Sequence, residues 1–155
     1  MAQDISHLTQ LLKTTRNNIQ RLMDAFTIEQ LNQIPNGFNN NLIWNYGHVV
    51  ITHQLLIYGL SGLPMKVDNE LVAKYRKGTK PETQIDSNEY DYLKNLFHEL
   101  PEITLADYEQ GIFQNYKRYE TSFGATLEKV EDGILFNNMH EAMHFGTMLS
   151  IRKFI

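Results

Sequence analysis

The sequence contains no cysteine, which removes disulfides, thiolate metal ligands and a cysteine nucleophile from consideration. This absence fits a reducing compartment. The opening residues, MAQDISHLTQ, have neither a basic start nor an apolar run, so we expect no signal peptide. No apolar segment approaches the roughly 20 residues that span a bilayer. The sequence therefore predicts a cytoplasmic protein with no membrane partner.

The chain also lacks an excess of basic residues, since 14 Lys and Arg stand against 18 Asp and Glu for a net charge of −4. Binding to nucleic acid requires a basic surface that neutralises phosphates. We therefore expect no nucleic-acid partner. The 155 residues, 42% of them hydrophobic, have the composition of one globular domain, predicted to cover residues 1–155.

Four long segments place apolar residues at steps of three and four, the pattern of helices with one face toward a core. The long helices are expected at 3–26, 39–60, 88–111 and from 127 or 132 to 153, with short ones over 27–34 and 69–76. Pro101 is expected to kink the third long helix, and two separate helices remain an alternative. Segment 112–125 has no helical stripe and is expected to cross the outside. No run alternates as a strand does, so the predicted class is all-α, a four-helix bundle.

The most informative polar pattern is HEAMH, which contains His140 and His144. Four residues turn a helix by about 400°, so both rings leave the same face one turn apart. This is how a single helix offers two nitrogen ligands to one metal ion. Both histidines lie in the stripe that faces the core, where unpartnered imidazoles are costly. The alternative is a pair of core histidines satisfied by neighbouring carbonyls or carboxylates.

A third histidine on another long helix would complete such a site. His48 and His53 lie five residues apart, about 140° around the helix, so they cannot both reach one point. Gly47, which permits a neighbouring backbone to approach closely, precedes His48. The helix wheel prefers His48 but leaves both open. His7 and His98 lie off the apolar stripes and are expected to face solvent.

HEAMH also matches HExxH, the signature of zincin peptidases, in which Glu141 would be the general base. A zincin needs a third ligand downstream, whereas the eleven residues after His144 include no His, Asp or Glu. We therefore do not expect a peptidase. Glu141 leaves the helix about 100° from His140 and is expected to reach a hydrogen-bond donor near the site or solvent.

Three stretches resemble the DinB/YfiT-like metalloprotein superfamily, and more closely its small stand-alone bacterial members: LIWNYGHVVITHQLLIYGLSGLP, YETSFGATLEKVEDGILF and HEAMHFGTMLSIRKFI. The resemblance covers nearly the whole chain. In that family the histidine of WNxGH and both histidines of HxxxH bind one divalent metal, which implies His48, His140 and His144 as ligands. The resemblance also implies an up-up-down-down order of helices and a homodimer.

Characterised members of the family include transferases that use low-molecular-weight thiols such as bacillithiol, and mycothiol-dependent isomerases. Three neutral imidazoles leave a position open on zinc, nickel or iron, as catalytic sites do. The leading hypothesis is a metal-dependent transferase that adds such a thiol to an electrophilic substrate. The alternatives are a hydrolase that uses metal-bound water, a non-catalytic metal-binding stress-response protein, and a metal-free interaction module.

Helical phase suggests which side chains surround the histidines. Trp44, Tyr46 and Phe136 are candidate apolar walls, and Tyr58 or Asn137 are candidate polar contacts. Core packing is the alternative for each of them. The aromatic segment 112–125 is likewise either a dimer surface or ordinary core. No catalytic residue is assigned.

Overall fold

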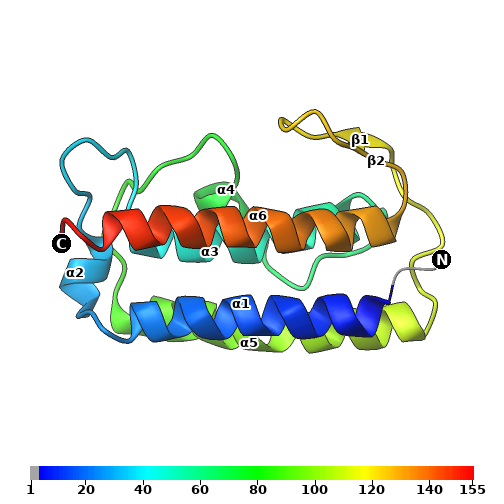
Figure 1. Cartoon of the computed structure of the whole chain (residues 1–155), viewed down its shortest axis with the longest axis horizontal. Helices are drawn as coiled ribbons and strands as arrows, with labels where there is room; N and C mark the ends of the chain where they lie inside the picture. The colour runs from blue at the N-terminus through cyan, green and yellow to red at the C-terminus, as the bar shows by residue number, and fades with distance from the viewer. Residues whose placement is uncertain (1–3) are drawn as a thin grey trace.

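The structure, a computed structural model, describes residues 4–155 (Figure 1). Its elements are α1 (Ile5–Met23), α2 (Ile28–Asn32), α3 (Leu42–Gln54), the π-helical turn η1 (Leu55–Gly59), α4 (Asn69–Tyr75), α5 (Ser87–Glu109), β1 (Tyr119–Glu120), β2 (Thr126–Leu127) and α6 (Val130–Ile151). The protein is mostly helical, which confirms the all-α class. Strands β1 and β2 form a small antiparallel hairpin that was not predicted. Within the described range, no helix has the length and apolar character of a membrane span.

The helices begin where short polar side chains satisfy their free N–H groups. Asp4, Asn41, Asp68 and Asp86 each accept a hydrogen bond from a backbone N–H three residues further on. Thr27 begins α2 with a capping box. These caps explain why the helix bounds agree with the predicted ones within a few residues. Residue 3, where the first helix was expected to begin, lies outside the described residues.

Pro101 does not interrupt α5, which runs as one helix from Ser87 to Glu109. Because proline has no N–H, the carbonyl of Phe97, four residues earlier, loses its helical partner. Arg16 of α1 donates a hydrogen bond to that carbonyl instead. The alternative of two separate helices is therefore wrong, and α5 is bound to α1 where its own hydrogen-bond ladder is broken.

Four long helices lie alongside one another, with α1 and α6 running one way and α3 and α5 the other (Figure 1). Side-chain contacts agree, since Gln20 contacts Tyr90 while Arg16 contacts Phe97, which makes α1 and α5 antiparallel. The order is thus up-down-down-up, and the up-up-down-down order was wrong. The reason lies in the connections. The chain reverses after α1 through the short α2, and the long segment 60–86, which carries α4, returns the chain along the helices before α5.

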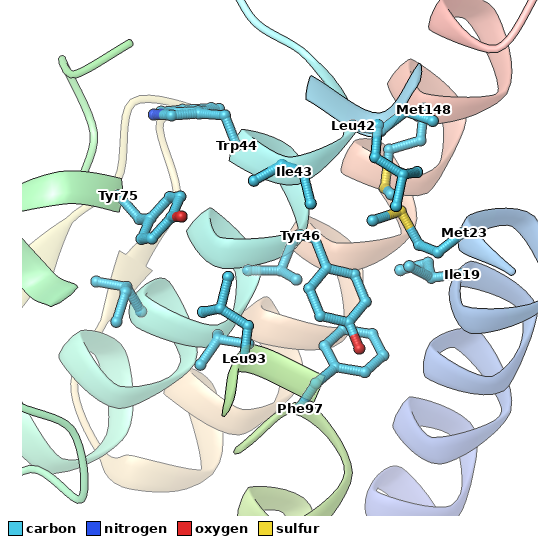
Figure 2. Close-up of a cluster of buried hydrophobic side chains, with 14 of the residues drawn as sticks. Ile19, Met23, Leu42, Ile43, Trp44, Tyr46, Tyr75, Leu93, Phe97 and Met148 are labelled. Carbon is cyan, nitrogen blue, oxygen red and sulfur yellow. The ribbon is translucent and has the colours of Figure 1, made fainter. Parts of the chain in front are cut away.

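Helix α3 is buried on nearly all sides, as its wide apolar arc predicted. On one side Tyr46 stacks on Phe97 of α5, with ring centroids 4.2 Å apart (Figure 2). Trp44 extends from α3 in another direction, beside Tyr75 (Figure 2). Tyr46 therefore lies on the side of α3 that packs against α5, whereas Trp44 lies beside α4. This orientation determines which of the two side chains can reach the histidines.

Candidate metal centre

Three imidazoles from two antiparallel helices converge in the structure. His48 comes from α3, and His140 and His144 come from successive turns of α6. One nitrogen of each ring lies within 4.8 Å of the others. The Nε2 atoms of His48 and His140 are 3.3 Å apart. Two nitrogens that bind one zinc ion tetrahedrally also lie about 3.3 Å apart, so this spacing fits a metal site.

Hydrogen bonds on the far side of two rings determine which nitrogen is protonated. His48 Nδ1 lies 2.7 Å from the carbonyl oxygen of Tyr75. His144 Nδ1 lies 2.8 Å from Oδ1 of Asn45, whose amide nitrogen donates to the carbonyl of Asn41. Both oxygens can only accept, so each Nδ1 carries the proton and donates. Each Nε2 therefore has a lone pair available to a metal ion, as in metal-ligating histidines held by an outer hydrogen bond. The hydroxyl of Thr52 lies 3.3 Å from the Nε2 of His48.

The ring of His140 lacks an outer hydrogen bond of this kind. Among residues 4–155, two buried side-chain polar atoms have no hydrogen-bond partner: Nδ1 of His140 and Oδ1 of Asn137. The amide nitrogen of Asn137 donates to Glu141 at 2.9 Å, which leaves the amide oxygen as the free acceptor. Residues 137 and 140 are three apart on α6 and so lie on the same side of the helix. No hydrogen bond joins the two atoms, so the tautomer of His140 is not fixed by the chain; with the proton on Nδ1, its Nε2 lone pair also faces His48.

The electrostatics keep all three rings neutral near pH 7. Burial, with smaller contributions from His144, His48 and Lys77, lowers the pKa of His140 to about 3. Burial and His48 lower the pKa of His144 to about 4. Burial also lowers the pKa of His48. Neutral imidazoles keep their lone pairs, which is the state that binds a metal ion.

A buried ion pair lies next to the cluster. The Glu141 carboxylate accepts hydrogen bonds from Arg16 Nε at 2.9 Å and from Nη2 at 2.7 Å. Arg16 thus engages both oxygens of Glu141 in a bidentate pair. The donor expected for Glu141 is therefore Arg16, and no oxygen remains free to act as a general base in the manner of a zincin.

A cavity of about 460 Å³ opens beside two of the histidines, His48 and His140. Its apolar walls include Phe136 of α6 and Phe123 of the hairpin, whose rings meet edge to face at 5.6 Å. The other lining residues are Thr52, Leu55, Leu56, Gly59, Leu60, Lys77, Lys117, Tyr119, Thr121 and Ser122. Phe136 was predicted as a wall, whereas the hairpin and the lysines were not. They belong to connecting segments, which have no periodicity to place them.

Trp44 also lies at the site. Its ring stacks on His48 with centroids 4.6 Å apart and an interplanar angle of 11°. The indole N–H donates to Thr79 at 3.0 Å. Trp44 therefore positions the ring of His48 without lining the cavity, so it is a wall of the site rather than of the cavity.

Two other candidate residues lie elsewhere. Tyr46 is in the core, where its hydroxyl donates to Gln20 at 2.7 Å. The hydroxyl of Tyr58 donates to Asp107 at 2.6 Å. Neither lines the cavity, because both point from α3 and η1 toward α1 or α5 rather than toward α6. Tyr46 is therefore removed from the candidate site.

The remaining histidines do not join the cluster. His53 is buried against Thr104 of α5, with Nε2 and Oγ1 3.5 Å apart, and burial lowers its pKa well below the usual value. His7 and His98 are exposed, as expected. The structure thus brings His48, and not His53, to His140 and His144.

Gly47 has a local role that the sequence predicted only in part. A Cβ at this position would lie 2.5 Å from Cδ1 of Tyr75, so a glycine is required for α4 to dock on α3. The close neighbour is the ring of Tyr75, not a backbone as expected. The same residue supplies the carbonyl that holds His48. Tyr75 could not be found from the sequence, because its contribution is a backbone atom.

Comparisons with known proteins concern the family and the fold. The family model described as the DinB superfamily matches residues 11–148. The fold is similar to the crystal structure of a conserved protein from Enterococcus faecalis, with a TM-score of 0.61 and 11% sequence identity over 100% of this chain and 98% of that chain. At this identity the likeness concerns the fold alone. No curated protein matches the sequence.

Proposed function

The chain belongs to the DinB superfamily, and we propose that it binds one divalent metal ion through His48, His140 and His144. One observation carries the proposal: outward hydrogen bonds from Nδ1 leave the Nε2 lone pairs of His48 and His144 for a cluster with His140. A metal ion placed between these nitrogens, which lie 3.3 Å apart, would bind both lone pairs, whereas without it one ring has to donate an N–H to the other. The residues present therefore fit the metal.

Three nitrogen ligands suit zinc, nickel or iron and leave at least one position open. A divalent ion bound there acts as a Lewis acid and lowers the pKa of a thiol or water that occupies the open position. The chain itself supplies the neutral ligands and a cavity with mainly apolar walls. Trp44 and the Tyr75 carbonyl orient His48.

We propose that the reaction is transfer of a low-molecular-weight thiol to an electrophilic substrate: a carbon–sulfur bond forms as the bond to the leaving group breaks, and the leaving group takes up the proton that the thiol releases. The lining of the cavity includes no Asp or Glu, and Arg16 engages the nearest carboxylate, Glu141. An ionised thiol attacks without help from a protein base, whereas hydrolysis gains from one. The absence of a free carboxylate from this lining therefore favours thiol transfer over hydrolysis.

We also propose that the four long helices form one four-helix domain over residues 1–155 and that two copies associate through α6. Leu135, Met139 and Met143 are spaced by four on one face of α6 and are 39%, 55% and 41% exposed. Such a stripe is typical of an interface. Sedimentation velocity should give a dimer for wild type and a monomer for Met139→Glu. Leu11→Glu, at a similarly exposed residue of α1, is the matched control and should stay dimeric.

Elemental analysis of tag-free protein tests the metal site. Wild type should contain about one divalent ion per chain, and the His48→Ala/His140→Ala/His144→Ala variant should contain little. His53→Ala is the matched control, because it alters a buried histidine of the same helix and should retain the metal. Retention by the triple variant, or loss in His53→Ala with retention in His48→Ala, would overturn the assignment.

The reaction is tested on metal-loaded protein with bacillithiol and a generic electrophile. Conjugation should be faster than in buffer and faster than with the triple variant, which circular dichroism must show to be folded. Hydrolysis of an activated ester with no conjugation would replace the transferase by a hydrolase. If the protein binds metal but shows neither conjugation nor hydrolysis, the remaining interpretation is a non-catalytic metal-binding protein.

A further inference from the structure

The cavity beside the histidines has a charge opposite to that of the whole chain. Lys77, just after α4, and Lys117, between α5 and α6, both line it, and its lining includes no Asp or Glu. The chain as a whole carries −4. Two cations from segments 40 residues apart in the chain thus border one cavity in an acidic protein.

These two charges are not neutralised by neighbours. Across residues 4–155, ion pairs form at other lysines and arginines, and neither Lys77 nor Lys117 takes part in one. Glu120 and Glu128, which lie near in the sequence, are within 3.0 and 3.9 Å of Arg118 instead. Both lysines are exposed and therefore available to a ligand that enters the cavity.

The rest of the cavity is mainly apolar. Leu55 and Leu56 from η1, with Phe123 and Phe136, are among its apolar lining residues. The volume of about 460 Å³ lies within the range of about 300–1,000 Å³ that is typical of small-molecule sites. Hydroxyl groups such as Thr52 are the other polar groups of the lining.

We propose that this cavity binds an organic anion, a small molecule with an apolar body and a carboxylate. The body packs against Phe136 and the leucines of η1, and the carboxylate lies at Lys77 and Lys117. His48 and His140 line the same cavity, so the bound molecule lies beside the proposed metal site. This names the substrate class of the proposed reaction and rests on that function for its chemistry, whereas the preference for an anion rests on the lysines.

Three probes with one apolar body separate charge from hydrophobicity: 4-phenylbutyrate, 4-phenylbutanol and 4-phenylbutylamine. Their dissociation constants are measured by calorimetric titration of the metal-loaded protein at low salt. The carboxylate should bind about tenfold more tightly than the alcohol, because each of two exposed charge contacts contributes about threefold. The amine should bind most weakly, and added salt should reduce the difference.

Two variants and a control assign the preference to the lysines. Lys77→Gln/Lys117→Gln should bind the carboxylate and the alcohol equally, and Lys77→Glu/Lys117→Glu should favour the amine. The control, Arg152→Gln/Lys153→Gln, removes the same charge at the far end of α6 and should keep the preference. A preference that survives in Lys77→Gln/Lys117→Gln, or probes that do not bind to wild type, would overturn the inference.

Metal content measured on the same samples keeps this inference separate from the proposed function. Full metal with no anion preference overturns the inference alone. An anion preference without metal overturns the proposed function alone. If the preference persists in the lysine variants and disappears in His140→Gln, the carboxylate binds the metal directly and the inference is wrong.

Discussion

Two polar clusters lie side by side inside the protein, and their hydrogen bonding differs completely. In the first, Arg16 and Glu141, whose side chains are 1% and 0% exposed, form a bidentate pair. Arg16 also donates to the carbonyl of Phe97. In the second, the nitrogens of His48 and His140 that face each other have no carboxylate or carbonyl between them.

The difference separates a structural cluster from a binding one. The first cluster is satisfied by the chain alone and joins α1, α5 and α6. In the second, Tyr75 and Asn45 hold two of the rings from the outer side. On the inner side the nitrogens face one another, with the Thr52 hydroxyl 3.3 Å from His48. Buried polar groups are normally paired within the protein, so a set left open on one side indicates a ligand that the chain does not supply.

The largest effect is expected from breaking the first cluster. Arg16→Met leaves a buried carboxylate without its partner and should lower the free energy of unfolding by about 3–5 kcal/mol. Urea denaturation in the presence of a chelator measures it. Arg16→Met/Glu141→Leu removes both charges and should recover most of the loss. If Arg16→Met costs no more than His140→Gln under the same conditions, the two clusters do not differ as described.

Adding metal should act on the second cluster alone. Zinc at one hundred times its dissociation constant should raise the free energy of unfolding of wild type by about 2.7 kcal/mol. His140→Gln should show little increase, because it lacks one ligand. Arg16→Met/Glu141→Leu retains all three histidines and should show the full increase. Equal stabilisation of wild type and His140→Gln would mean that zinc binds elsewhere.

The support behind His48 is tested by two glycines in helices. Gly47→Ala places a methyl group against the ring of Tyr75 and should cost about 1–3 kcal/mol and weaken metal binding. Gly146→Ala is the matched control, since nothing lies within 4 Å of its Cβ. This change should stabilise the protein by about 0.5–1 kcal/mol through helix propensity. Similar effects of the two changes on metal content would remove Tyr75 from the site.

The smallest effect concerns pH in metal-free protein. The pKa of His140 is about 3 when folded and about 6.5 when unfolded, so the unfolded chain binds the proton first as pH falls. This difference in proton binding has little effect well above pH 6.5. Below that pH it lowers the free energy of unfolding progressively, until the pH reaches the folded pKa of about 3. From pH 7 to 6, His140 should account for about 0.7 kcal/mol of lost stability. Urea denaturation of His140→Gln should show a fall in the free energy of unfolding between pH 7 and 6 that is smaller than that of wild type by this amount. The same pH dependence in wild type and variant would contradict a neutral His140.

The helices could be predicted because apolar periodicity and capping residues are local signals. Because these signals are local, they do not predict features that depend on long-range contacts. Pro101 signalled a break in α5, but a long-range contact from Arg16 satisfies the freed carbonyl. The order of helix directions depends on how segment 60–86 crosses the molecule, which no local pattern encodes.

In the candidate site, too, the sequence predicted what depends on local spacing and missed what depends on long-range packing. The spacing of His140 and His144 places both rings on one face, whereas His48 and His53 remained alternatives until the family resemblance favoured His48. Tyr46 was predicted as a wall together with Trp44, yet it lies two residues away, about 200° around α3, and packs on Phe97 instead. Lys77 and Lys117 carry no sequence signal, because each lies in a connecting segment.

The histidines and the lysines come from different kinds of structure. His48, His140 and His144 lie well inside long helices, whereas Lys77, Lys117 and Phe123 lie in the segments that connect them. Connecting segments accept substitutions and insertions more readily than helix interiors do. Ligand selectivity and metal retention can therefore diverge independently during evolution, and an engineer can randomise the connections to obtain new specificities on one unchanged helical frame.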